Sequence, residues 1–194
     1  MNKEKKLHLD KKGIRVFAIA ESFKKENLIS IIAGIVMRKD LIVDGVVFGN
    51  VTIGGNDATD SIISMVKNQE RNDINLILLD GMIISMYNII DGEEIFKTTS
   101  IPVIAITFKD SFGIDQSIKN YFPYNYKTKI ESYNKLGERK KIMLKTGKFL
   151  FIRNWGITIQ DSINIINSFL IQGAIPEPIR IAKMIARAHV RINK

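Results

Sequence analysis

The first part of the chain alternates runs of hydrophobic residues with short polar links. The runs cover 13–20, 27–37 and 41–53, and the links between them read ESFKKE and RKD. Links this short are typical of hairpins, which join strands that lie antiparallel. The pattern therefore predicts three antiparallel strands at the start of a sheet.

After these runs the pattern changes to strands that alternate with helices. Residues INLILLDGM (74–82) contain an unbroken aliphatic run, which is typical of a strand buried on both faces. Capping residues and apolar stripes mark the neighbouring helices. In order, the predicted elements are a helix within 54–69, a strand over 74–80, a short helix near 91–98 and a strand over 101–108. Such alternation favours parallel pairing of the two strands.

Beyond residue 110 the pattern is largely helical. The segment 148–156 is compatible with a strand or its remnant. Thr158-x-x-Asp161 is a weak capping-box variant at the start of a helix, and Pro178 suits the first turn of the last helix because that position needs no amide donor. The predicted helices are DQSIKNYF (115–122), the basic segment 127–145, a helix that stops at Gly173, and the final helix.

These elements together predict one α/β domain. Antiparallel N-terminal strands followed by parallel strands, with helices on both faces, describe a ribonuclease-H-like mixed sheet. Flavodoxin-like and Rossmann-like arrangements remain open as alternatives. We expect residues 1–12 to form a flexible basic N-terminal tail and residues 13–194 to form the single domain.

The composition is 45% hydrophobic and 25% charged, which is ordinary for a globular protein with a core. No apolar stretch reaches the length of a membrane span, and no secretory apolar region follows the basic N-terminus. The absence of cysteine excludes disulfides and thiolate metal sites. We therefore expect a cytoplasmic protein without membrane contact, while the sequence sets no oligomeric state.

Positive charge indicates the class of partner. The formal net charge is +9, and residues 127–148 carry eight basic residues against two acidic ones. Basic clusters interleaved with aromatics suit nucleic acid, whereas a solvated lysine-rich helix is the alternative interpretation. We expect phosphate contacts from Lys127, Lys129, Arg139, Lys140 and Lys141, and base stacking by Tyr124 and Tyr126.

Familiar catalytic motifs are missing from the sequence. It contains no G-x-x-x-x-G-K-[ST] phosphate loop, no G-x-G-x-x-G after a strand and no G-x-S-x-G elbow. Zinc sites of the usual kinds are disfavoured because the chain has no cysteine and two histidines. Carboxylates are therefore the remaining candidates for chemistry.

Two carboxylates follow predicted strands directly, Asp80 and Glu21. A magnesium- or manganese-dependent nuclease needs two to four oxygen ligands, usually from different strands. We take Asp80 and Glu21 as the candidate catalytic and metal-binding residues. Asp57 and Glu177 are further ligands in an alternative arrangement of such a site.

Two segments resemble endonuclease V. They are LILLDGM, an aspartate-glycine pair after a hydrophobic run, and 156–187, which contains the signature Pro176, Glu177, Pro178, Arg180 and Ala182. The chain resembles still more closely an archaeal family known as domain of unknown function ninety-nine, through KKGIRV, NDAT, LDG, IPVI and IPEPIRIA, from about residue 11 to 190. The resemblance implies an endonuclease-V-like, ribonuclease-H-like fold. The structural interpretation of Glu177, as the alternative to metal binding, is that it fixes the entry of the final helix and pairs with Arg180.

The sequence departs from the endonuclease V pattern at its acidic positions. The resemblance implies an aspartate on the first strand, a glutamate near the end of the third strand and an aspartate after the proline signature. Here these positions are Ala20, Gly54 and Lys183, and Glu21 is displaced by one residue toward the opposite face. Asp80 alone matches, and we expect the Lys183 ammonium to pair with it where a metal would bind.

Three functions follow from these observations. The first is nucleic-acid binding in repair or processing, with a degenerate metal site and weak or no cleavage. The second is an active Mg- or Mn-dependent endonuclease on deaminated or damaged DNA or RNA, with Asp80 as chief ligand. The third is a non-enzymatic assembly protein with an acidic protein partner. The sequence leaves open whether the chain is an enzyme.

Overall fold

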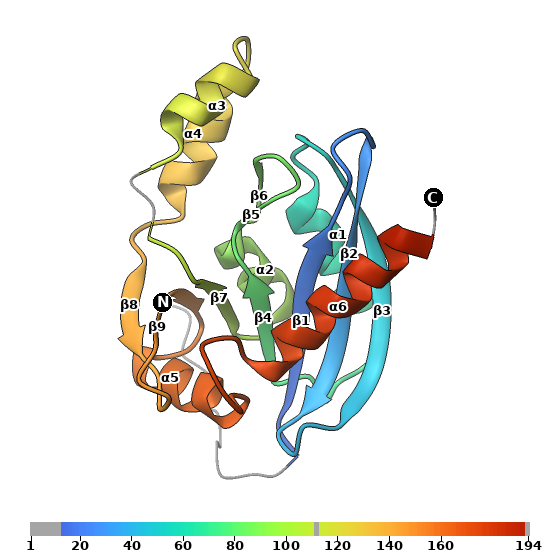
Figure 1. The fold of residues 1–194 in the computed structure, drawn as a ribbon, viewed down its shortest axis with the longest axis vertical. Helices are drawn as coiled ribbons and strands as arrows, with labels where there is room; N and C mark the ends of the chain where they lie inside the picture. Colours follow the sequence, from blue (N-terminus) through green and yellow to red (C-terminus); the bar gives the residue numbers. More distant parts are fainter. Residues whose placement is uncertain (1–12, 111–112, 193–194) are drawn as a thin grey trace.

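The computed structural model describes residues 13–110 and 113–192, so the expected tail at 1–12 lies outside the described residues. A mixed seven-stranded sheet forms its centre, in the order β3-β2-β1-β4-β7-β9-β8 (Figure 1). The strands are β1 (Arg15–Ser22), β2 (Ile29–Arg38), β3 (Val43–Thr52), β4 (Leu76–Asp80), β7 (Val103–Thr107), β8 (Lys140–Met143) and β9 (Phe149–Trp155). A separate small hairpin pairs β5 (Ile83–Ile84) with β6 (Asn88–Ile89).

The strand pairing follows the predicted order. β1, β2 and β3 are antiparallel neighbours, β4 runs parallel to both β1 and β7, and β9 pairs antiparallel with β7 and with β8. The prediction of antiparallel strands followed by parallel strands is confirmed. Since β1, β4 and β7 run in one direction, their carboxyl ends meet at one edge of the sheet, where ligands gather in α/β proteins.

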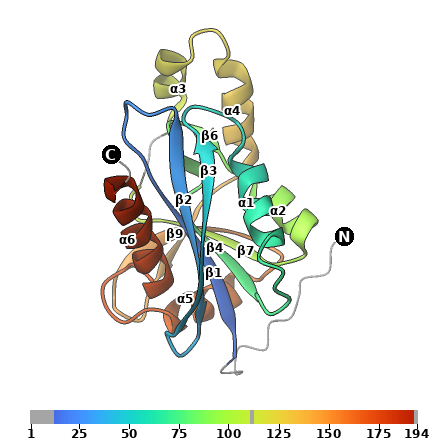
Figure 2. The ribbon, with the colours of Figure 1, turned by 90° about the vertical axis from the view of Figure 1, so that its right-hand side faces the viewer.

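Helices cover both faces of the sheet. They are α1 (Ala58–Lys67), α2 (Gly92–Thr99), α3 (Asp115–Tyr121), α4 (Tyr126–Lys135), α5 (Ile159–Ser168) and α6 (Glu177–Ile192). Figure 2 shows α6 on one side of the sheet and α1 and α2 on the other, while α3 and α4 project beyond the sheet edge. We call the first side the α6 face and the second the α1/α2 face.

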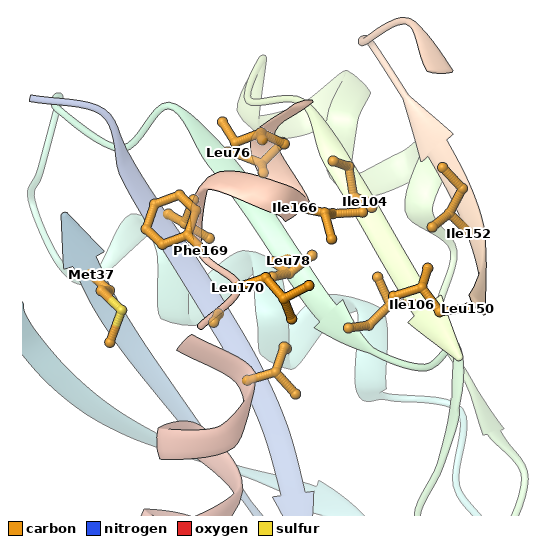
Figure 3. Packing of buried hydrophobic residues seen from close by; sticks show 14 of the residues in the cluster. Met37, Leu76, Leu78, Ile104, Ile106, Leu150, Ile152, Ile166, Phe169 and Leu170 are labelled. Carbon is orange, nitrogen blue, oxygen red and sulfur yellow. The ribbon is translucent and has the colours of Figure 1, made fainter. Parts of the chain in front are cut away.

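Alternation along the central strands fills two cores. On β4, Leu76 and Leu78 join the core of the α6 face, whereas Ile77 and Leu79 join the core of the α1/α2 face. Figure 3 shows the α6-face core, with Leu78 from the sheet beside Ile166, Phe169 and Leu170. Since both faces are covered, β4 is apolar at every position up to Asp80, as its sequence indicates.

One predicted helix is wrong in its second half. The basic segment was expected to be helical over 127–145, but α4 ends at Lys135 and residues 140–143 form the edge strand β8. Gly137 lies between them with a φ of 69°, a left-handed conformation that favours glycine and ends the helix. Of the two interpretations of 148–156, a strand or its remnant, the structure shows a strand, β9.

Candidate functional site

Asp80, the last residue of β4, is bound by Lys183 from α6. The Lys183 Nζ atom lies 2.8 Å from Oδ2 and 3.0 Å from Oδ1 of the carboxylate. The Asp80 side chain is 14% exposed and that of Lys183 is 26% exposed, so the ion pair is largely shielded from water. Lys183 also lies over the Phe108 ring, with 5.4 Å from Nζ to the ring centroid. Lys183 therefore holds a fixed positive charge at the carboxyl end of β4.

Glu21 lies on the opposite face of the sheet from Asp80. The β1–β4 register pairs Ile19 with Leu79, so it is Ala20 that comes next to Asp80 on the α6 face. The β1–β2 pairing runs without a bulge through Ser22, so Glu21 stays on the α1/α2 face. There its carboxylate accepts hydrogen bonds from Ser85 N (2.9 Å), Ser85 Oγ (2.6 Å) and Ser30 Oγ.

The acidic residues do not fit a divalent-metal site. Both oxygens of Asp80 are engaged by Lys183, and Glu21 is held by serines on the other face. Within the described part of the chain, no three His, Cys, Asp or Glu side chains gather in a way that could hold a metal.

The other expected metal ligands have structural partners. Asp57 accepts hydrogen bonds from Thr52 N and from Asn88 Nδ2, which fix the turn before α1 and, outweighing the effect of burial, lower the pKa of its carboxyl group. Glu177 is buried at the start of α6 and accepts a hydrogen bond from Arg180 Nε at 2.8 Å. Pro176 and Pro178 lie on either side of it. Neither carboxylate lines a cavity with Asp80.

A larger pocket, of about 400 Å³, opens beside Asp80 at the ends of β4 and β7. Its walls are mainly apolar, and three cationic side chains, Lys109, Arg139 and Arg153, lie at its margin. The full lining is Asp80, Gly81, Met82, Ile83, Ile106, Thr107, Phe108, Lys109, Asp110, Tyr133, Arg139 and Arg153. A volume in this range is typical of small-molecule sites.

The two arginines of this pocket differ in their partners. Arg139 donates hydrogen bonds to Lys109 O (3.0 Å) and forms an ion pair with Asp110 (3.3 Å). Arg153 donates to Gly137 O through Nε (2.9 Å) and Nη2 (2.8 Å), and among the described residues no carboxylate lies within 4 Å of it. Burial, and then the neighbouring charge of Arg139, lower the pKa of the Arg153 guanidinium. An anionic group bound here would relieve the repulsion between the two cations.

Lys129, expected to contact phosphate, is turned into the protein. It is 3% exposed, and its Nζ atom donates hydrogen bonds to Gly55 O, Asn56 Oδ1 and Tyr87 O at 2.9–3.0 Å. The ammonium also lies 4.6 Å from the centroid of Phe122. Burial without a carboxylate partner lowers its pKa. The ammonium is therefore held by acceptors of the protein itself.

The remaining predicted contacts lie in two places. Lys127, Tyr124 and Tyr126 lie on or just before α4; Tyr124 is fully exposed, and Lys119 lies over the ring of Tyr126. Lys140 and Lys141 are exposed neighbours on β8, and since successive strand residues alternate, they point to opposite faces. Of the seven predicted nucleic-acid contacts, Arg139 is the one that lines the pocket with Asp80.

Sequence reasoning missed Arg153, Tyr133 and Phe151. Arg153 and Phe151 lie on β9 within an apolar run that had no certain element type, and Tyr133 was counted only as one aromatic of the basic stretch. Alternation along FLFIRNW carried a usable signal, because it places Phe149, Phe151 and Arg153 on one face.

A search of the helices within 13–110 and 113–192 found none that is long and apolar enough to cross a bilayer.

Comparison with known proteins places the chain in a family. A model of the family described as Endonuclease dU matches residues 12–190. A UPF0215 protein of Pyrobaculum calidifontis is 36% identical over 170 residues, which cover 87% of this chain and 93% of the relative. A solved structure of a protein of unknown function from Archaeoglobus fulgidus has a TM-score of 0.80 and 27% identity, covering 91% of this chain and 98% of that one.

Endonuclease V structures share the fold at lower identity. Human endonuclease V has a TM-score of 0.67 at 13% identity, covering all of this chain and 92% of that one. Endonuclease V of Ciona intestinalis, solved in complex with DNA containing an inosine, has a TM-score of 0.62 at 13% identity, covering 93% and 87%. The predicted endonuclease-V-like, ribonuclease-H-like fold and the resemblance to an archaeal family are confirmed.

Proposed function

The chain belongs to the Endonuclease dU family, and from that membership we propose that it binds DNA containing deoxyuridine in the pocket beside Asp80. Strand cleavage is weak or absent in this proposal. The observation that carries it is the pocket itself, which combines apolar walls with the Arg139–Arg153 pair at the strand ends of an endonuclease-V-like sheet.

The pocket has the chemistry expected for one nucleotide taken out of the base stack. Its volume of about 400 Å³ gives room for a base, and Met82, Ile106 and Phe108 supply apolar surface around it. The guanidinium groups of Arg139 and Arg153 suit the oxygens of the adjoining phosphate, because they present several donors in one plane. A deaminated base is unpaired or weakly paired, which lowers the cost of taking it out.

Asp80 and Lys183 support binding over metal-dependent cleavage. The ammonium of Lys183 occupies the side of the carboxylate where a cation would have to bind, and no other described carboxylate completes a ligand set. A magnesium or manganese ion would therefore have to displace Lys183 and find its remaining ligands in water and phosphate. Recognition by the pocket needs no such ion.

Endonuclease activity at deoxyuridine is the second candidate. The description of the family favours it, as does the solved complex of Ciona endonuclease V with DNA containing an inosine. Asp80 would be the carboxylate that serves the reaction, since it lies at the end of β4 on the pocket wall.

Binding is tested with fluorescently labelled oligonucleotides that differ only in one deoxyuridine or thymidine, measured by anisotropy in EDTA. We expect tighter binding to the deoxyuridine strand, and weaker binding of both strands in Arg153→Gln, because this side chain is assigned to the phosphate that both strands share. Arg187→Gln removes the same charge from an exposed position of α6 outside the pocket and serves as the control. Equal affinity for both strands would contradict the proposed recognition, and failure to bind either would favour the assembly-protein alternative.

Cleavage is tested on the same strands by denaturing electrophoresis in magnesium, manganese or EDTA. Intact strands under all three conditions support a binding protein. A metal-dependent nick in the deoxyuridine strand that is absent from the thymidine strand would establish the endonuclease instead, provided that Asp80→Asn abolishes it.

A further inference from the structure

The strands β8 and β9 form the outer edge of the sheet and present one face that carries aromatic and cationic side chains. In their antiparallel register, Lys141 pairs with Phe151 and Met143 with Phe149. Directly paired residues point to the same side, so these four side chains share one face, together with Arg153 two residues further along β9. We call this surface the β8–β9 face.

The opposite side of the same two strands is core. Ile142, Leu150 and Ile152 are buried on the α6 face, under α5. On the β8–β9 face, by contrast, Phe149 is 50% exposed and Met143 is 64% exposed. Polar residues ordinarily occupy the open face of an antiparallel edge, so exposed aromatic and thioether groups in this row mark an interaction surface.

Cations lie against the rings of this face. Lys141 Nζ is 4.9 Å from the centroid of Phe149, and Arg139 Cζ is 5.0 Å from the centroid of Phe151. The two rings are two residues apart on β9, which separates them by about 7 Å along the strand. A row of rings with adjacent cations matches a nucleic-acid strand, whose bases stack while its phosphates meet the positive charges.

The β8–β9 face is continuous with the pocket. Arg139 and Arg153 line the pocket beside Asp80, and with Phe151 they also line a hollow of about 270 Å³ next to the hairpin. Asp110 and Glu138 are the acidic residues of this hollow. A strand that leaves the pocket at these arginines meets Phe151 next and then Phe149. In a duplex the faces of the bases are already stacked on neighbouring base pairs, so a strand that stacks on these rings has to be single-stranded and unstacked here.

We propose that the β8–β9 face binds an unpaired stretch of a nucleic-acid strand that continues from the nucleotide held in the pocket. The proposal rests on the proposed function and adds the form of the substrate, a single-stranded flank read by stacking and charge without regard to base sequence. Phe149 and Phe151 provide the stacking surface, and Lys141 contacts phosphate.

The two adjacent lysines of β8 provide a matched test. Lys141→Ala and Lys140→Ala remove the same charge from exposed neighbours. The sequence predicted both as phosphate contacts, but Lys140 pairs with Ile152 and points to the other face, so this proposal assigns the contact to Lys141 alone. Binding of a labelled single-stranded oligothymidine, followed by anisotropy, should weaken in Lys141→Ala and remain near wild type in Lys140→Ala. Equal loss in both variants would overturn the proposal, because it would indicate a general effect of charge.

Substitutions at Phe149 separate stacking from packing. Phe149→Leu keeps apolar bulk without an aromatic ring and should weaken single-strand binding by roughly tenfold, while Phe149→Trp should retain it. Thermal melting of both variants checks that the fold is intact, and Phe48→Leu, at an exposed site on the opposite edge strand β3, is the aromatic control. Wild-type binding by folded Phe149→Leu would overturn the stacking role.

The failure of this proposal is distinguishable from failure of the pocket. The preference for deoxyuridine over thymidine should survive in Lys141→Ala and Phe149→Leu, because both contact the flank and not the base. If that preference persists while both variants bind single strands as tightly as wild type, the proposed role of the β8–β9 face is wrong. The proposed recognition of deoxyuridine by the pocket is then unaffected. A duplex bound more tightly than a single strand of the same length would also overturn the proposal.

Discussion

At the scale of single residues, the candidate site is defined by a lysine that meets a carboxylate. Lys183 is a point charge on a flexible stem, and its contact with both oxygens of Asp80 gives it one fixed position. This charge belongs to the chain itself, so its presence in the site does not depend on the concentration of an ion. A bound metal ion would instead come and go with its concentration.

The ion pair can be measured by a double-mutant cycle. Asp80→Asn and Lys183→Met each leave a shielded charge without its partner, so each should lower the free energy of unfolding by about 1–3 kcal/mol. The double variant should lose less than the sum, with a coupling energy on the order of 1 kcal/mol by urea denaturation. Strict additivity would show that the two charges do not interact in solution.

Removing the lysine should also reveal the latent cation affinity of Asp80. We expect Lys183→Met to bind magnesium or manganese weakly, with a dissociation constant on the order of millimolar, and we expect wild type to bind neither; calorimetry measures both. Lys183→Arg retains a cation and is the control. Wild-type affinity equal to that of the methionine variant would mean that an ion displaces Lys183 easily, and the endonuclease candidate would then gain support.

Lys129 is a second residue whose setting makes a measurable prediction. Its folded pKa lies below the ordinary value of 10.5 because the ammonium is buried, so the folded state binds fewer protons than the unfolded chain between those two pKa values. The free energy of unfolding should therefore rise with pH in that window, relative to Lys129→Met. Urea denaturation of both proteins from about pH 8 upward tests this. A difference that stays constant with pH would show that the ammonium is well solvated.

At the scale of elements, the turn between β5 and β6 links the end of β1 to the α4 region. Ser85, Met86 and Tyr87 all have positive φ, at 44°, 57° and 66°, a costly conformation for residues other than glycine. Glu21 holds Ser85 at one end, and Lys129 holds the carbonyl of Tyr87 at the other. Glu21 is therefore built into the support of this turn.

Removing Glu21 should loosen the turn. Glu21→Ala leaves the amide and hydroxyl of buried Ser85 without their acceptor, so the free energy of unfolding should fall by about 1–3 kcal/mol. Hydrogen exchange should accelerate at residues 84–88 before other parts of the chain. Glu21→Gln keeps an acceptor oxygen and should lose less. An unchanged free energy of unfolding in Glu21→Ala would show that Glu21 does not support the turn, and Glu21 would again be a candidate functional carboxylate.

The success of sequence-based prediction also depends on the element. The central strands were predictable because burial on both faces leaves an unmistakable run such as LILLD, and the Asp80–Lys183 contact followed from a change of charge at one position. The edge strand β8 was not predictable, because it is only four residues long and its sequence KKIM fits a basic helix equally well. The inward turn of Lys129 depends on acceptors from two distant loops, which periodicity cannot reveal.

At the scale of the whole molecule, the net charge of +9 predicts strongly salt-dependent association with nucleic acid. Affinity for any oligonucleotide should fall at least roughly tenfold between about 50 and 200 mM salt. The ratio of affinities for deoxyuridine and thymidine should not change, because base contacts release no counterions. Anisotropy titrations at several salt concentrations measure both quantities. A salt-independent affinity would show that the basic surface plays no part in binding.

The position of α6 has a consequence for how the protein is made. This last helix packs on β1 and β2, the first strands of the chain, and Lys183 is 103 residues from Asp80 in sequence. During synthesis the N-terminal strands therefore emerge long before the helix that covers their apolar side. The nascent sheet therefore exposes this apolar surface until α6 has been synthesised, and during that interval the surface is open to aggregation.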